Sequence, residues 1–142
     1  HSAGGHYASL LALRPATPGR VPIAGCLPIS GVYEFGEGAG LAQRPRFLGP
    51  EPSREVDAAA SPLRQTLKGA PPFFITWGER DFPHLITQAR RMAEALRQAG
   101  VPVRTLELPG ADHFEACYAS AELNGAWVEN ATAFMREVAP VT

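Results

Sequence analysis

The stretch His1-Ser2-Ala3-Gly4-Gly5 decides how the rest of the sequence is interpreted. A serine followed by small residues, and then by an apolar run with helical spacing, is typical of the G-x-S-x-G turn that joins a strand to a helix. In that turn the small residues let strand and helix approach closely, while the serine hydroxyl stands exposed on a strained backbone. The first glycine of the motif would precede His1, so four of its five positions are present. We therefore take Ser2 as the candidate nucleophile.

The bulk composition is that of one globular domain. The chain has 142 residues, of which 45% are hydrophobic, and this suits a single packed domain. It carries 13 basic and 14 acidic residues, so charge gives no support for a nucleic-acid or membrane partner. No apolar run approaches the ~20 residues of a membrane-spanning helix. Cys26 and Cys117 lack the spacing of a disulfide framework or zinc site; we expect two reduced, largely buried thiols and a cytoplasmic protein.

Strand-like and helical patterns alternate along the chain. Strands are predicted at 23–29, 73–77 and 101–108, and helices at 3–13, 53–68, 83–99 and from about 127 to Pro140. Pro28 lacks an N–H for the ladder, so the first strand is expected to stop there or to lie at an edge of the sheet. Such alternation predicts an α/β architecture with a parallel sheet flanked by helices. The segment 30–52 is rich in glycine and proline, which indicates a long loop. We expect one partial domain over residues 1–142, with a loop and short-helix excursion at 34–62.

In a parallel sheet, reactive groups gather on the loops that leave the carboxyl ends of the strands. A serine hydroxyl becomes a good nucleophile only when an imidazole takes its proton, and a carboxylate must hold that imidazole in the right tautomer. Four histidines compete for the role of base. His1 adjoins the nucleophile in a tight turn and is expected to point away; His6 suits packing or capping, and His84 a solvated helix start. His113 follows the last strand in a short loop and is the predicted base.

The predicted carboxylate is Asp81, which follows the strand 73–77. Its rivals are Glu79, Glu115 and Asp112, and the last of these is too close to His113 along the chain to hold the ring without strain. Asp81 could also serve as a helix N-cap. The order Ser2, Asp81, His113 is the order Ser…Asp…His found on α/β-hydrolase sheets. An ordered set on successive strand ends is a stronger signal than any one of its members.

Several segments together resemble the C-terminal half of an α/β-hydrolase of the esterase/lipase group, most of all its arylformamidase-like and small carboxylesterase members. The segments that carry this resemblance are His1–His6, Ile29–Tyr33, Ala60–Leu63, Trp77–Asp81 and Gly110–Phe114. The resemblance implies that Ser2 accepts the acyl group, that His113 is the general acid and base, and that Asp81 orients it. It also implies that the backbone N–H of Ala3 donates to an oxyanion.

The same resemblance implies what lies outside the sequence. In this group the other oxyanion donors come from a His-Gly-Gly-type loop upstream of the serine, and the N-terminal strands of the sheet also precede it. We therefore expect the chain to require that N-terminal part, in the same or in a separate polypeptide. No metal or organic cofactor is indicated.

The expected reaction is hydrolysis of a small carboxylic ester through an acyl-serine intermediate. Tyr33, Phe82 and Phe114 are predicted to line the substrate pocket, with ordinary packing as the competing interpretation for each. Two alternatives stay open: an arylformamidase that hydrolyses N-formylkynurenine-type amides, and a non-catalytic binding module built on the same fold. Pocket shape separates the first alternative from the ester hydrolase, and sequence pattern does not reveal it.

Overall fold

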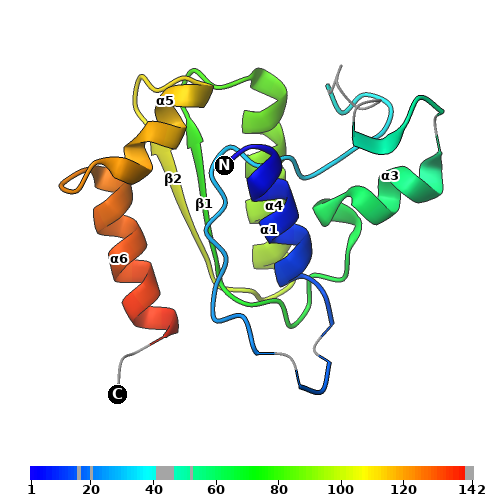
Figure 1. Cartoon of the computed structure of the whole chain (residues 1–142), viewed down its shortest axis with the longest axis horizontal. Coiled ribbons are helices and arrows are strands. Elements are labelled where there is room, and N and C mark those ends of the chain that lie inside the picture. The colour runs from blue at the N-terminus through cyan, green and yellow to red at the C-terminus, as the bar shows by residue number, and fades with distance from the viewer. Residues whose placement is uncertain (16, 20, 41–46, 52, 140–142) are drawn as a thin grey trace.

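The computed structural model describes residues 1–15, 17–19, 21–40, 47–51 and 53–139. Its elements follow the predicted alternation of helices and strands (Figure 1). In chain order they are α1 (Ala3–Ala12), α3 (Arg54–Ala60), the 3₁₀ helix η1 (Pro62–Arg64), β1 (Phe73–Gly78), α4 (Pro83–Gln98), β2 (Val103–Leu108), α5 (His113–Tyr118), the 3₁₀ helix η2 (Ala119–Ala121) and α6 (Ala126–Val138).

The sheet is parallel. β1 and β2 pair in parallel with Phe73 opposite Val103, and segment 26–29 lies along the other edge of β1, joined by isolated bridges from Cys26 and Ile29. The strand predicted at 23–29 is therefore an extended segment rather than a regular strand. Pro28 has no N–H to donate to the ladder, and this interrupts regular pairing. Its carbonyl still accepts from Thr76 N at 3.1 Å.

Helices cover both faces of β1, and every residue of this strand is buried, as expected for a parallel sheet between two helical layers. Because side chains alternate along a strand, Ile75 packs in one cluster with Met92 of α4. Phe74 points to the other face, where its ring centroid lies 5.9 Å from that of Phe134 in α6. Figure 1 shows α1 and α4 on one side of the strands and α6 on the other.

The helices differ from the sequence-based bounds in instructive places. α4 begins at Pro83 as predicted and buries its apolar stripe, while Gly100 follows it with φ of 78°. The single helix expected at 53–68 is instead α3 followed by η1, because Pro62 cannot continue the hydrogen bonding of the preceding turn. Of the predicted excursion at 34–62, residues 41–46 and 52 lie outside the described residues, as does the predicted helix end at Pro140.

The strands direct their carboxyl ends toward α5, and the first residue of the chain lies at the same end (Figure 1). The loops after β1 and β2 also emerge there, so this edge carries the candidate site. Among the described residues, no helix is both long and apolar enough to cross a bilayer.

Candidate active site

Ser2 occupies a strained turn at the start of α1. Its backbone has φ of 51° and ψ of −121°, a region that residues other than glycine rarely adopt. The turn is held because Ser2 N donates to Ile29 O at 2.9 Å. The close approach between α1 and segment 26–31 favours glycine at position 5, since a Cβ there would lie 3.1 Å from Gly31 Cα and the backbone would have to yield slightly. The small residues after Ser2 thus do what the motif predicts.

Asp81 lies in the turn that follows β1. Its N–H donates to Gly78 O at 3.1 Å, and its side chain is fully buried. Oδ1 accepts from the backbone N–H of Phe82 at 2.7 Å. The N-cap position of α4 is Phe82 rather than Asp81, so the carboxylate is free to face the sheet edge instead of closing the helix.

His113 is the first residue of α5, and its neighbours fix where that helix begins. Asp112 accepts from the N–H groups of Phe114 and Glu115, while Glu115 accepts from Asp112 N, which forms a capping box. These backbone hydrogen bonds lower the pKa of Asp112. Two of the rival carboxylates therefore cap the helix that presents His113.

The structure brings the three predicted residues together in one hydrogen-bonded row. His113 Nδ1 lies 2.8 Å from Asp81 Oδ1, and His113 Nε2 lies 3.1 Å from Ser2 Oγ. Because a carboxylate can only accept, Nδ1 carries the ring proton and Nε2 is left to accept the hydroxyl proton of Ser2. This arrangement can transfer a proton from serine to imidazole and stabilise the resulting imidazolium.

The third rival carboxylate, Glu79, has a different partner. Its Oε2 accepts from Gly110 N at 2.6 Å, and Arg80 N donates to Ala111 O at 2.9 Å. These bonds tie the loop after β1 to the loop after β2. Glu79 therefore holds together the two loops that carry Asp81 and His113.

Two of the other histidines, His1 and His84, lie closer to the site than their sequence positions suggested. His1 was expected to point away, yet its Nε2 donates to the backbone carbonyl of His113 at 2.8 Å, and the two rings are 4.5 Å apart. His84 was expected to be solvated, yet it lines the pocket beside Ser2, and burial lowers its pKa. His6 packs as expected: it is buried and bonds to Ala60 O.

A pocket of about 560 Å³ opens beside the row. Its walls include Ser2, His113, Phe47, Phe82, His84 and Phe114. Phe82 and Phe114 also contact the catalytic candidate directly, with ring centroids 5.0 Å and 5.5 Å from that of His113. The structure thus places these two predicted lining residues at the pocket, which is mostly apolar as ligand sites usually are.

Tyr33 does not line this pocket, and here the sequence-based expectation is wrong. The side chain is fully buried in the cluster that holds Ile75 and Met92. Burial raises the pKa of its hydroxyl well above the usual value. The competing interpretation, ordinary packing, is the one that the structure supports.

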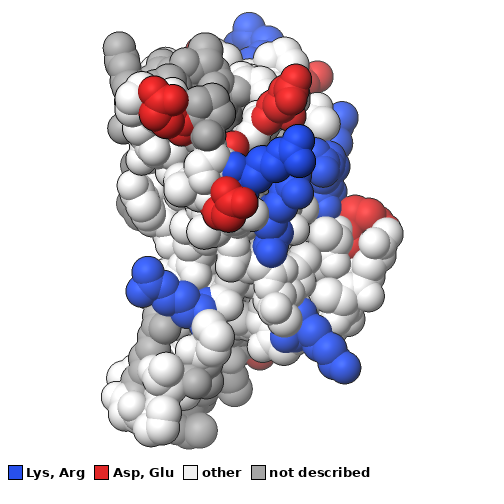
Figure 2. All heavy atoms as spheres, turned by 90° about the vertical axis from the view of Figure 1, so that its right-hand side faces the viewer, with Lys and Arg blue, Asp and Glu red and all other residues white. Residues whose placement is uncertain are grey.

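The wall of the pocket that includes Val32 is fixed by the loop that follows it. Gln88 of α4 accepts from Tyr33 N at 2.8 Å and donates to Ala39 O at 2.9 Å. Glu34 pairs with Arg64 and with Arg91. The pair with Arg91 ties the loop to α4, and the pair with Arg64 ties it to η1. Figure 2 shows basic and acidic side chains next to one another on the face that it views.

The backbone N–H of Ala3 is the predicted oxyanion donor. Ala3 is the first residue of α1, and the N–H groups of a first helical turn have no acceptor within their own helix. The nearest helical hydrogen bond is made by Gly5 N to His1 O at 3.2 Å. Ala3 N–H is therefore one of the N–H groups without an acceptor inside α1.

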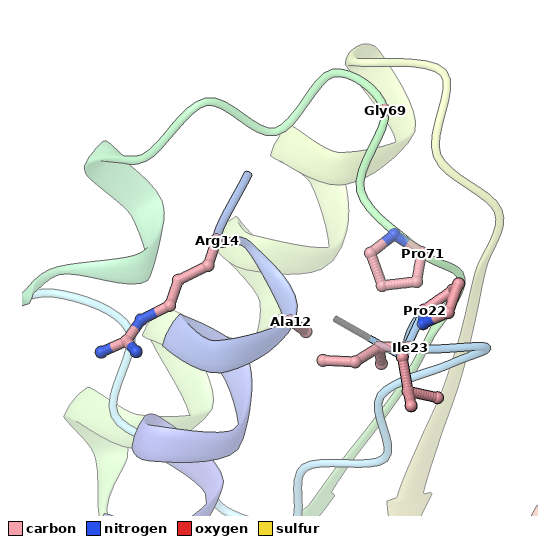
Figure 3. A pocket seen from close by; sticks show the side chains of 7 residues that line it. Ala12, Arg14, Pro22, Ile23, Gly69 and Pro71 are labelled. Atoms are coloured by element: carbon pink, nitrogen blue, oxygen red, sulfur yellow. The ribbon is translucent and has the colours of Figure 1, made fainter. Parts of the chain in front are cut away.

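A second hollow, of about 260 Å³, lies at the far end of α1 from Ser2. Figure 3 shows it lined by Ala12, Pro22, Ile23 and Pro71, with the side chain of Arg14 directed away from the prolines. None of its described lining residues carries a nucleophile. Among the described residues, no group of three or more His, Cys, Asp or Glu is placed to hold a metal.

The contact between Ser30 and Asp81 was not predicted from the sequence. Ser30 Oγ donates to the second carboxylate oxygen of Asp81, Oδ2, at 2.5 Å. Its only sequence signal is its place directly after the apolar run 23–29, at the edge where strand ends gather. A serine there has no spacing rule that would connect it to Asp81.

Curated proteins similar to this chain are esterases. The chain is 35% identical over 131 residues to Esterase LipQ of Mycobacterium tuberculosis, which covers 79% of the chain and 31% of that protein. It is 34% identical over 132 residues to the probable carboxylic ester hydrolase LipM of the same organism, with 79% and 30% covered. The chain thus spans about a third of the length of these curated relatives.

Solved structures agree on the fold. An acetyl ester-xyloside bifunctional hydrolase from Caldicellulosiruptor lactoaceticus superimposes with a TM-score of 0.82 at 20% identity, covering 99% of this chain and 56% of that one. Apo Thermogutta terrifontis esterase 2 gives a TM-score of 0.73 at 25% identity, with 99% and 55% covered. A family model described as "alpha/beta hydrolase fold" matches residues 1–116. This chain therefore belongs to the α/β-hydrolase family, as its Ser2 turn and its parallel sheet predicted.

Proposed function

We propose that this protein hydrolyses small carboxylic esters through an acyl-Ser2 intermediate. The observation that carries the proposal is the directed row from Ser2 Oγ through both ring nitrogens of His113 to Asp81. Ser2 can give its hydroxyl proton to His113 Nε2, and Asp81 can hold the ring in that tautomer and stabilise the imidazolium that forms. Similarity to curated esterases supports an ester rather than an amide as the substrate.

In the first half of the reaction, Ser2 Oγ attacks the ester carbonyl while His113 Nε2 takes the hydroxyl proton. The tetrahedral oxyanion accepts a hydrogen bond from Ala3 N–H. His113 then gives its proton to the leaving alkoxide, which departs as the alcohol and leaves the acyl group on Ser2. Asp81 stays ionised and stabilises the imidazolium between these two transfers.

In the second half, water enters the pocket and His113 takes one of its protons as the oxygen attacks the acyl carbon. The tetrahedral intermediate collapses, Ser2 regains its proton from His113, and the carboxylic acid leaves. Bonds and protons balance over the cycle, and no redox or metal step is needed. The roles of all three residues are the ones that the sequence predicted.

We further propose that efficient turnover uses at least one oxyanion donor from polypeptide outside residues 1–142. The chain spans 31% of Esterase LipQ and 56% of the Caldicellulosiruptor enzyme. Loss of one oxyanion donor typically costs about 2.7–4 kcal/mol of transition-state stabilisation. The chain 1–142 alone should therefore turn over at least about 100-fold more slowly than a full polypeptide that carries it.

Labelling by a serine-directed fluorophosphonate tests the proposal. In the full polypeptide that carries residues 1–142, we expect one adduct, located on Ser2 by peptide mass mapping, and none in Ser2→Ala. The control Ser9→Ala removes another buried hydroxyl, which donates within α1 to Gly5 O, and should label normally. An unlabelled Ser2 in folded protein contradicts the proposal and favours a binding module.

Turnover of p-nitrophenyl acetate and butyrate, measured beside N-formylkynurenine, tests the substrate class. We expect ester kcat/KM to exceed formamide kcat/KM by at least 10-fold, because the relatives are esterases. The reverse order would identify the protein as an arylformamidase.

A further inference from the structure

Ser30 lies at the carboxyl end of segment 26–29, beside β1. It is fully buried, and its N–H donates to Thr76 O at 2.8 Å. Its backbone has φ of 49°, in the left-handed region that favours glycine. A serine kept in such a conformation suggests that its side chain is needed where it stands.

The hydrogen bonds of the Asp81 carboxylate show what that side chain does. Oδ1 accepts from His113 Nδ1 and from Phe82 N, at 2.8 Å and 2.7 Å. Oδ2 accepts from Ser30 Oγ at 2.5 Å. The carboxylate is fully buried, so water cannot readily replace a lost donor, and a buried charge without partners is costly.

These contacts also fix the rotation of the carboxylate. Ser30 holds Oδ2 on the side away from His113, and the other oxygen is then left facing the imidazole. Without the hydroxyl, the hydrogen bonds that described residues make to the carboxylate all fall on Oδ1. The carboxylate can then rotate about its terminal bond, because that torsion is broad for aspartate.

We propose that Ser30 is a positioning residue for the hydrogen-bonded row of the site. It acts through Asp81 to hold His113 in its reactive tautomer and orientation. The inference rests on the proposed function, and it assigns to Ser30 a role outside the three predicted residues. Ser30 does not contact the pocket, so it should affect the chemical step and leave substrate binding unchanged.

Kinetics of Ser30→Ala and Ser30→Gly in the full polypeptide test this role. Both variants should lower kcat for p-nitrophenyl acetate by about 10- to 100-fold, the range for losing a hydrogen bond to a charged group. KM should stay within about twofold. Ser30→Gly removes the hydroxyl while easing the φ of 49°, so it guards against an effect of misfolding.

Ser9→Ala is the matched control, since Ser9 is a fully buried serine whose hydroxyl donates to Gly5 O at 2.8 Å. It should keep kcat within about twofold. Equal kcat in Ser30→Gly and the control would overturn the role of Ser30. A fall in kcat in Ser30→Ala and Ser30→Gly that only follows their loss of thermal stability would also overturn it.

A readout that does not depend on turnover separates this inference from the proposed function. The proton between His113 Nδ1 and Asp81 should give a downfield ¹H NMR resonance in the wild type, absent in His113→Gln. In Ser30→Ala and Ser30→Gly it should shift upfield or broaden through exchange. An unchanged resonance refutes the positioning role even if esters are hydrolysed. A changed resonance supports it even if fluorophosphonate fails to label Ser2.

Discussion

Gly78 is the position where one added methyl group should separate the two loops that carry Asp81 and His113. It ends β1, and a Cβ built on it would lie 2.3 Å from Ala111 O, 2.9 Å from Ala111 C and 2.9 Å from Asp112 O. All three atoms are backbone, so no flexible side chain can yield. Gly78→Ala therefore introduces a steric clash that should push apart the loops after β1 and β2.

The size of the displacement follows from the geometry. Real Cβ atoms essentially never approach within 3.0 Å, so the 2.3 Å contact must open by at least 0.7 Å. If the side chains move with their loops, the distance from His113 Nδ1 to Asp81 Oδ1 would lengthen from 2.8 Å toward about 3.5 Å, beyond a normal hydrogen bond. Misplacement by about 1 Å can cost 100-fold in rate, and overpacking costs about 1–3 kcal/mol of stability.

We expect Gly78→Ala to lower kcat/KM for p-nitrophenyl acetate by about 30- to 100-fold, with a smaller unfolding free energy in urea. The control Gly100→Ala also places alanine in a strained conformation, at φ of 78°, but has no atom within 4 Å of the added Cβ. It lies at the opposite end of β2 from His113 and should lose stability while keeping activity within about threefold. A folded Gly78→Ala protein with wild-type kcat/KM would refute the reasoning.

Three further changes probe the same structure. Gly5→Ala should slow fluorophosphonate labelling of Ser2 at least tenfold, because the added Cβ would lie 3.1 Å from Gly31 Cα; equal labelling rates would contradict this. Burial lowers the pKa of His6, so the unfolded state binds its proton more readily, and stability should fall by up to about 1.4 kcal/mol per pH unit as pH drops below ~6.5. Urea unfolding at pH 7.5 and 5.5 should show a smaller difference in His6→Gln than in wild type; identical differences would exclude His6 as a source. Phe114→Ala opens one wall of the pocket and should lower kcat/KM for p-nitrophenyl butyrate about 3- to 10-fold more than for the acetate, whereas an unchanged ratio would remove Phe114 from acyl binding.

The parts of the fold that sequence predicts well are those set by local pattern. The apolar run 73–77 has the composition of a buried strand, and the structure buries every residue of β1. The stripe of α4 follows from its 3.6-residue period, with its start set by Pro83. The fold class follows from the alternation of such elements, and the family match over residues 1–116 confirms it.

Departures from the predicted elements come from single residues that alter hydrogen bonding. Pro28 turns a predicted strand into an extended segment with isolated bridges. Pro62 divides a predicted helix into α3 and η1. Apolar periodicity does not register such breaks, because both prolines lie among residues that suit the predicted element.

In the site, too, the residues marked by local sequence could be predicted, and those whose place depends on tertiary packing could not. Ser2, Asp81 and His113 could be placed in advance because each follows a chain-local feature, namely a small-residue turn or the end of a strand. Tyr33 could not be assigned to the core from sequence, because Val32 next to it lines the pocket and only tertiary packing separates the two.

Ser30 shows why the supporting contacts escape sequence analysis even when the main residues do not. Its partner, Asp81, is 51 residues away along the chain, and no periodicity links a strand-end serine to a carboxylate on the next strand. The contact exists because parallel strands deliver their carboxyl ends to one edge. A search for such support should therefore begin with polar residues at the ends of strands that neighbour a predicted acid, and in this chain that rule selects Ser30 beside β1.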